Sequence, residues 1–137
     1  MAAALAGVRQ LAFSRHTGNG VLTVYPASDP AGIPFPISRV FTIAGVAPGG
    51  VRGRHAHRRC TQLITCLSGQ VTVLVTDGHA SREIVLATGA DGLLVPPGVW
   101  TTLTFASEAA VVAVFCDQPY DEGDYIRDWD EFLRSHA

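Results

Sequence analysis

The chain has 137 residues, of which 47% are hydrophobic and 16% are charged, and its formal net charge at pH 7 is -2. This composition excludes a disordered chain and argues against a general nucleic-acid-binding domain, which would be basic. All ten basic residues are Arg, which excludes chemistry that needs a lysine amine. The length predicts one domain over residues 1–137 with a core of its own.

In the first part of the chain, apolar and β-branched runs predict strands, and clusters of Gly, Pro, Asn and Ser predict turns. Ser14–Gly20 is a predicted polar turn and Pro26–Pro36 a predicted irregular connection. The strands predicted around these two segments cover Val8–Phe13, Val21–Tyr25 and Ile37–Val46.

The remainder continues this pattern and then changes character. A hairpin across Ser68-Gly69 and a helix within Asp124–His136 are predicted, the helix because apolar residues recur there at helical spacing. About ten short strands and one short C-terminal helix predict an all-β fold, an antiparallel sandwich or barrel, of which the jelly roll is one form. After Pro48-Gly49-Gly50, the predicted strands are the segment around His55, Gln62–Leu67, Gln70–Thr76, Arg82–Leu86, Leu93–Val95, Thr101–Phe105 and Ala110–Cys116.

His55 and His57 are two positions apart on a predicted strand. Side chains at i and i+2 point to the same face of a sheet, so the two imidazoles should lie side by side. Imidazole titrates near neutral pH, binds metals and moves protons. A pair of idle surface histidines is the alternative.

Four arginines flank the histidine pair. Because guanidinium groups bind phosphate in a bidentate manner, the cluster suggests an anion site. A charged, solvated edge strand is the alternative, and it applies most to the last two members. The four residues are Arg52, Arg54, Arg58 and Arg59.

The three cysteines have no CxxC spacing, which favours buried thiols in a reduced, cytoplasmic setting. The N-terminal segment lacks the basic region of a signal peptide. No apolar run approaches the roughly 20 residues of a membrane span, so no membrane association is expected.

The spacing from Gly49 through His55, His57 and Gln62 to Gly69 resembles the first cupin motif, and Pro96-x-Gly98 followed by Thr101 resembles the second. Metal-binding cupins carry a Glu where this chain has Gln62 and a His where it has Thr101. Two imidazoles with an amide and a hydroxyl are a poor donor set for a divalent first-row ion. We therefore expect no metal and no other cofactor.

A narrower resemblance rests on several segments in order. Arg52-Gly53-x-His55-Ala56-His57, Cys66-Leu67-Ser68-Gly69, Pro97-Gly98-Val99-Trp100 and the tail from Tyr120 to Asp128 resemble the dTDP-4-keto-6-deoxyglucose 3,4-ketoisomerases, which are small cupins. The pattern is most similar to members that serve antibiotic deoxysugar pathways, such as the tylosin pathway. The resemblance implies a cupin-type antiparallel jelly roll.

The resemblance also implies a reaction. A ketone moves from C4 to C3 of a dTDP-linked 6-deoxyhexose through an enediol, with no net oxidation, and the chain has no GxGxxG fingerprint of a dinucleotide site. Neutral imidazoles suit such proton transfer. We expect His57 to handle the carbon proton and His55 to assist oxygen protonation or orientation.

The substrate carries a diphosphate and a thymine base, and residues for both are expected. Arg39 and Arg52 are the candidate clamps for the diphosphate. Trp100 and Tyr120 are candidate platforms for the base, although either could instead belong to the core or an interface. Gln62 and Thr101 are candidates for hydrogen bonds to the sugar.

The chain departs from this family at two places. It has Thr17-Gly18-Asn19-Gly20 where many relatives have an acidic-x-Arg-Gly turn, and Phe41-Thr42 where many have two tyrosines. If a tyrosine relays a proton in those relatives, a water, Thr42 or His16 would have to replace it. The configuration of the product at C4, gluco or galacto, is left open.

The family also implies a homodimer, with exchange of an N-terminal strand such as Leu11–Phe13 as one form of it. Two other functions are kept as alternatives. One is a metal-dependent cupin enzyme, either a dioxygenase or an isomerase. The other is a non-catalytic module that binds nucleotide sugars.

Overall fold

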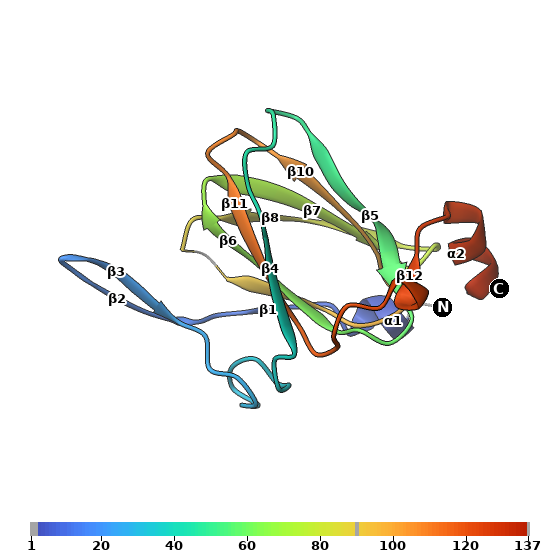
Figure 1. Ribbon diagram of the computed structural model, residues 1–137, viewed down its shortest axis with the longest axis horizontal. Helices are drawn as coiled ribbons and strands as arrows, with labels where there is room; N and C mark the ends of the chain where they lie inside the picture. Colours follow the sequence, from blue (N-terminus) through green and yellow to red (C-terminus); the bar gives the residue numbers. More distant parts are fainter. Residues whose placement is uncertain (1–2, 90, 137) are drawn as a thin grey trace.

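Two antiparallel sheets of five strands each pack face to face in the computed structural model, which describes residues 3–89 and 91–136 (Figure 1). The strand order is β1-β9-β6-β11-β4 in the first sheet and β12-β5-β10-β7-β8 in the second. The predicted antiparallel jelly roll with a short C-terminal helix is confirmed.

The elements follow one another in chain order, with short turns between most neighbours. They are α1 (Ala3–Ala6), β1 (Arg9–Leu11), β2 (Ser14–Gly18), β3 (Gly20–Val24), β4 (Arg39–Ile43), β5 (Val51–His57), β6 (Gln62–Ser68), β7 (Gln70–Thr76), β8 (Ser81–Ala87), β9 (Gly92–Val95), β10 (Trp100–Phe105), β11 (Val111–Cys116), the 3-10 helix η1 (Glu122–Asp124), β12 (Tyr125–Ile126) and α2 (Trp129–Ser135).

The main core fills one end of the space between the sheets. Alternate residues of β7 and β8 point inward there, and Val71, Val73, Val75 and Leu86 are fully buried. β-Branched side chains pack well on a pleated surface, which explains why these runs form central strands. A second cluster lies where the connection after β3 covers the first sheet, with Ile33 and Phe35 at its centre.

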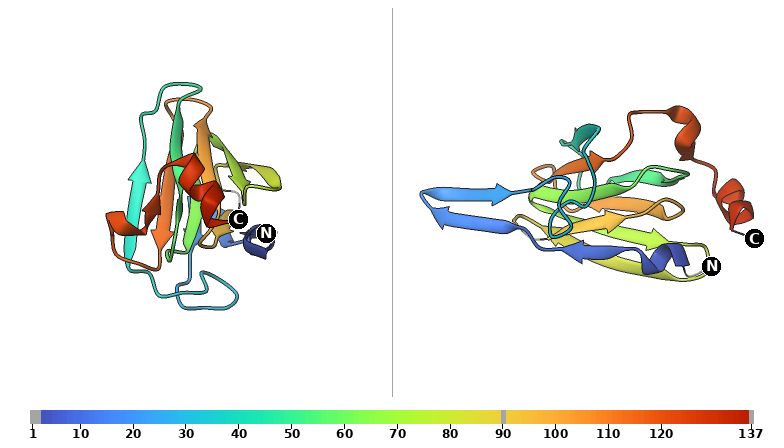
Figure 2. Two further views of the ribbon diagram at one scale, coloured as in Figure 1. Left: turned by 90° about the vertical axis from the view of Figure 1, so that its right-hand side faces the viewer. Right: turned by 90° about the horizontal axis from the view of Figure 1, so that it is seen from below.

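The strand β2 differs from the sequence-based prediction of a turn over Ser14–Gly20. Ser14–Gly18 pairs with β3, and the chain reverses at Asn19 between Gly18 and Gly20. The five residues of β2 are all exposed, so the strand carries no buried face that could have revealed it. Figure 1 and the right-hand view of Figure 2 show this hairpin projecting away from the two sheets.

The C-terminal segment also begins differently from the prediction. Tyr125 and Ile126 form β12, which pairs with β5, and the helix α2 starts only after Asp128, whose side chain accepts a hydrogen bond from the amide of Glu131. Aspartate is a favoured N-cap because its side chain satisfies a free amide of the first turn. No described helix is long and apolar enough to cross a membrane.

The helix α2 is fastened to the turn that precedes β10. Phe132 is fully buried, against Trp100 and in a cluster with Ala56 and Ile126. At the end of the helix, Nε2 of His136 donates a hydrogen bond of 2.7 Å to the carbonyl of Gly98. The amide of Gly98 in turn donates to the carbonyl of His57, so this helix is linked through one turn to the histidine strand.

Candidate active site

A cavity of about 450 Å³ occupies the other end of the space between the sheets. Its volume is within the range of small-molecule sites. The cavity is lined from both sheets and from the segment after β12, by Phe41, Thr42, Ile43, Val51, Arg52, Gly53, Arg54, His55, Gln62, Ile64, Thr101, Leu103, Val114, Tyr125 and Arg127.

Strand register brings four polar side chains to one face. His55 lies opposite Thr101 on β10, and His57 lies opposite Tyr125 on β12. Directly paired residues of antiparallel strands share a face, so all four point toward the cavity side. His57 is not itself a lining residue; it is buried behind the rings of His55 and Tyr125, whose centroids lie 5.0 and 4.4 Å from its own.

An irregularity in β5 determines which side chains of this strand reach the cavity. Gly53 and Arg54 both have positive φ, at 88° and 60°, and the pairing with β10 shifts between Thr101 and Thr102. A Cβ at Gly53 would approach the carbonyl oxygen of Thr101 to 2.9 Å, so only glycine fits here. Such a bulge turns consecutive side chains toward one side, and residues 51–55 all line the cavity.

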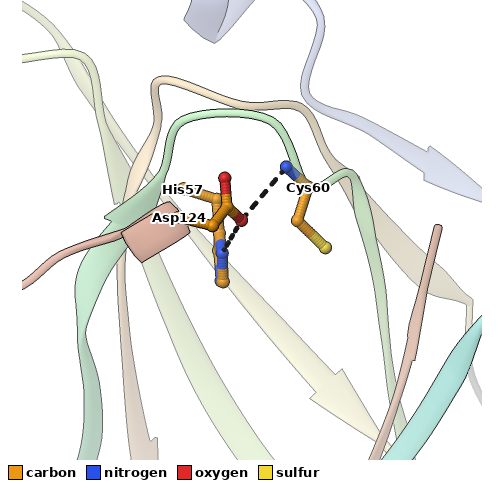
Figure 3. Close-up of side chains that lie close together, drawn as sticks. All are labelled: His57, Cys60 and Asp124. Carbon is orange, nitrogen blue, oxygen red and sulfur yellow. Dashed lines mark hydrogen bonds and ion pairs between the residues drawn. The ribbon is translucent and has the colours of Figure 1, made fainter. Parts of the chain in front are cut away.

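Asp124 is the partner of the catalytic candidate His57, and sequence reasoning missed it. Its Oδ2 accepts a hydrogen bond of 2.8 Å from Nδ1 of His57 (Figure 3). The amides of Arg59 and Cys60 also donate to this carboxylate, at 2.6 and 3.3 Å, and its own carbonyl accepts from the amide of Arg58. The turn after β5 is thus wrapped around a carboxylate that is only 3% exposed.

These bonds determine the charge states of the pair. Burial would raise the pKa of Asp124, but the hydrogen bonds from His57 and the two amides outweigh it and lower that pKa below its usual value. Burial lowers the pKa of His57, and the hydrogen bond to Asp124 opposes this only in part. With Nδ1 bound to the carboxylate, Nε2 carries the free lone pair, and it has no hydrogen-bond partner within the described residues.

His55 is also uncharged at neutral pH. Burial, and then the neighbouring imidazole of His57, lower its pKa to about 4. The site therefore presents two neutral imidazoles, as the sequence-based hypothesis of proton transfer requires.

The cluster of His57, Cys60 and Asp124 deserves a test as a metal site, because its donor atoms lie within 4.8 Å of one another (Figure 3). Both oxygens of Asp124 are already hydrogen-bond acceptors, and the thiol of Cys60 donates to the carbonyl of Thr61. The donors are thus engaged with the protein. These three residues therefore fit a hydrogen-bonded pair of His57 and Asp124 better than a site for a metal ion.

The arginines separate into two groups. Arg52 and Arg54 line the cavity, together with Arg127, and none of the described lining residues is acidic. Arg58 and Arg59 instead form exposed ion pairs with Glu131 and Asp121 of the tail, at 3.3 and 2.6 Å. The anion site suggested by the sequence would therefore use the earlier arginines, while the later ones bind the C-terminal segment.

The other predicted binding residues fall at different places. Gln62 and Thr101 line the cavity. Arg39 is not among the lining residues, but it donates a hydrogen bond of 3.3 Å to the hydroxyl of Tyr125, and its guanidinium lies 5.5 Å from the ring of Tyr120. Tyr120 itself is 60% exposed and binds Glu122.

The structure does not bring Trp100 to the cavity. It precedes Thr101 on β10, so its side chain points to the opposite face of the sheet. Its ring packs against Trp129 and Phe132 of α2, at centroid distances of 5.1 and 5.4 Å.

Tyr125 and Arg127 are further lining residues that the sequence analysis did not select. Both fall within Asp124–His136, the segment for which the sequence predicts a helix. Arg127 stacks on the ring of Tyr125 at 4.2 Å and forms two bonds to Glu122, of 2.7 and 3.0 Å. Hydrogen bonds from Arg127 lower the pKa of Glu122 to about 2.

Comparisons with known proteins point to one family. The family model described as "FdtA: WxcM-like, C-terminal" matches residues 7–137. A TDP-4-oxo-6-deoxy-alpha-D-glucose-3,4-oxoisomerase of Aneurinibacillus thermoaerophilus is 41% identical over 102 residues, which cover 74% of this chain and 73% of that protein.

Solved structures give the same result. The sugar 3,4-ketoisomerase QdtA of Thermoanaerobacterium thermosaccharolyticum, in complex with TDP, has a TM-score of 0.90 and 31% identity over 96% of both chains. A histidine-to-asparagine variant of QdtA, in complex with TDP-4-keto-6-deoxyglucose, has a TM-score of 0.88 and 30% identity, over 94% of this chain and 93% of that one.

Proposed function

Because the chain belongs to the FdtA family, whose relatives compared above are sugar 3,4-ketoisomerases, we propose that it converts TDP-4-keto-6-deoxyglucose to the TDP-3-keto-6-deoxyhexose. The observation that carries the proposal is the pair of neutral imidazoles, His55 and His57, beside a cavity with three guanidinium groups. Imidazoles of this kind accept protons, and the arginines attract a diphosphate.

In this mechanism His57 removes the proton from C3, which is acidic because it lies next to the ketone. Asp124 supports this role, since it holds the Nδ1 proton and stabilises the imidazolium that forms. The electrons of the C3–H bond give an enediol, and the same imidazolium returns a proton to C4. His55 lines the cavity and orients the sugar or assists its oxygens.

Substrate binding is proposed for residues of the cavity and its rim. Arg52, which lines the cavity, holds the diphosphate. Arg39, which is hydrogen-bonded to the hydroxyl of Tyr125, is the second diphosphate clamp. Gln62 and Thr101 bind sugar hydroxyls. The exposed ring of Tyr120 serves as the platform for the base, and Trp100 does not, because its ring packs against α2.

The assembly proposed is a homodimer of one-domain subunits in the cytoplasm. The projecting β2–β3 hairpin supports it, because Val21 and Leu22 are 57% and 60% exposed and Val24 is exposed beside them. Pairing or exchange of this N-terminal region with a second copy would cover these side chains. The three buried cysteines, all free thiols, agree with a reducing compartment. Light scattering after gel filtration, on the wild type and on Leu22→Asp, tests the dimer.

The experiment that tests the activity is incubation with TDP-4-keto-6-deoxyglucose in deuterated buffer, followed by NMR of the sugar. We expect the 3-keto isomer with deuterium at the exchanged carbon, no inhibition by EDTA, and loss of both reactions in His57→Asn. The NMR spectrum also gives the configuration at C4. Inhibition by EDTA together with a stoichiometric metal would favour a metal-dependent cupin enzyme, and binding of TDP without exchange would favour a non-catalytic module.

A further inference from the structure

The proposed isomerisation needs proton transfer at oxygen as well as at carbon. While hydrogen moves from C3 to C4, the ketone oxygen O4 must gain a proton and the hydroxyl oxygen O3 must lose one. His57, with its carboxylate partner, accounts for the carbon side only. The following inference rests on the proposed function and concerns the group that serves the oxygens.

Tyr125 is placed for this task. It lines the cavity, lies opposite His57 in the strand register, and has its ring centroid 4.9 Å from that of His55. Its phenol is therefore on the same face as the two imidazoles. A sugar whose C3 and C4 face these rings has its oxygens within reach of a hydroxyl on the neighbouring strand.

The other lining side chains are poorer candidates. His55 carries no ionisable imidazolium proton near pH 7, because its pKa is lowered to about 4 by burial, and a neutral imidazole is a very weak acid. Phe41 has no hydroxyl, and the alcohols of Thr42 and Thr101 are far weaker acids than a phenol, whose ordinary pKa is about 10. Guanidinium groups do not release protons in proteins.

Two cations adjoin Tyr125. Arg39 donates a hydrogen bond of 3.3 Å to the hydroxyl oxygen, so this oxygen remains free to donate its own proton elsewhere. The guanidinium of Arg127 lies 4.2 Å from the ring centroid. A transient negative charge on the phenol oxygen would be stabilised by both.

The geometry points to Tyr125 as a further catalytic residue, the acid and base that act on the two sugar oxygens. In the first half of the reaction, His57 takes the proton of C3, the C3=C4 bond forms, and the phenol gives its proton to O4. In the second half, the phenolate takes the proton of O3, the C3=O bond forms, and the imidazolium gives its proton to C4. Both residues return to their starting states, and no oxidant or reductant is consumed.

The test is Tyr125→Phe, which keeps the ring that packs on His57 and removes only the hydroxyl. Turnover to the 3-keto sugar and exchange of the C3 proton into deuterated buffer are measured in the same NMR experiment. We expect turnover to fall about 10²- to 10⁴-fold, the usual contribution of a general acid or base. Exchange should fall less than turnover, because exchange needs only the first of the two proton transfers by the phenol whereas turnover needs both, so the ratio of exchange to turnover should rise tenfold or more.

A smaller rise of this ratio overturns the assignment, whether or not activity falls, because a merely structural role would slow both reactions alike. Tyr25→Phe is the matched control and should leave the ratio unchanged, since this ring packs against Phe13 and Phe115 and does not line the cavity. If wild-type protein shows neither exchange nor turnover, the proposed function fails instead, which separates the two outcomes. Calorimetric binding of TDP verifies that each variant is folded.

A second variant covers failure of Tyr125→Phe to fold. Replacement of Tyr125 by 3-fluorotyrosine keeps the shape and the hydroxyl but makes the phenol more acidic. The basic limb of the kcat profile should move to lower pH, and an unchanged profile overturns the assignment. The wild type and the fluorinated protein must have the same titratable and charged groups around this phenol. These groups are Arg39 on β4, His55 and His57 on β5, Tyr120 and Glu122 before β12, and Arg127 after β12.

Discussion

Two regions share the space between the sheets. In both, alternate side chains of each strand point inward, but these side chains are apolar in one region and polar in the other. At the β7–β8 end, the inward positions hold Val73, Val75 and Leu86, which are fully buried and leave no polar atom to satisfy. At the β5–β12 end, the inward positions hold His57 and Tyr125. Buried nitrogens without a partner occur here, at Nδ1 of His55 and Nε2 of His57 among the described residues.

The difference separates stability from function. An unpartnered buried polar group costs about 1–3 kcal/mol, so the polar end gains nothing in stability from its free nitrogens. Those nitrogens are instead engaged in no hydrogen bond within the described residues that a proton transfer would have to break. The apolar end should therefore carry the free energy of folding, and the polar end the chemistry.

The strongest way to break this comparison is Asp124→Asn. The NH2 group of the asparagine would face a backbone N–H of Arg59 or Cys60, donor against donor. The neutral side chain would also no longer stabilise a charged His57. We expect kcat to fall about 10²- to 10⁴-fold, measured with TDP-4-keto-6-deoxyglucose. The matched control is Asp121→Asn, in the same segment but paired with Arg59 at the surface, and it should retain activity. Full activity of Asp124→Asn would mean that the carboxylate does not support the base.

The apolar end should respond in the opposite way. Leu86→Ala leaves a cavity in the core and should lower the free energy of unfolding by about 2–5 kcal/mol, measured by urea denaturation. Activity per folded molecule should be unchanged. Leu74→Ala, at a 40% exposed position of the neighbouring strand β7, should cost much less. Equal losses from the two variants would contradict the separation.

A pH titration sharpens the comparison with a smaller effect. The pKa of His55 is about 4 in the folded protein against an ordinary 6.5, chiefly because of burial. Between these values the unfolded chain binds more protons, so the free energy of unfolding should fall as the pH drops from 6.5 to 4. In His55→Asn the free energy of unfolding should fall by about 2 to 3 kcal/mol less than in the wild type over this pH range. Denaturation curves at both pH values measure it, and identical losses in the two proteins would show that His55 is not held neutral.

Sequence reasoning succeeded where a periodic pattern or a motif spacing exists. Most strands of the two sheets follow from their apolar and β-branched runs, some alternating and some continuous. The positions of His55, Gln62 and Thr101 around one cavity follow from the spacing of the cupin motifs. A strand of seven residues with one buried face leaves such a pattern.

The remaining features depend on tertiary contacts that leave no local pattern. The strand β12 has only two residues, too few for alternation, so Tyr125 gave no sign that it pairs with His57. Asp124 resembles any acidic residue before a helix, and only its bonds to His57 and to the amides of Arg59 and Cys60 reveal its role. The strand β2 is wholly exposed and is defined by its hairpin partner alone.

The bond between His136 and the carbonyl of Gly98 has a practical consequence for handling the protein. It connects the last helix, by way of one turn, to the backbone of His57, the residue proposed to remove the proton. A purification tag or fusion partner joined after His136 would change the surroundings of this hydrogen bond. Preparations that differ only in their C-terminal extension should then differ in specific activity, so the extension belongs in any comparison between laboratories.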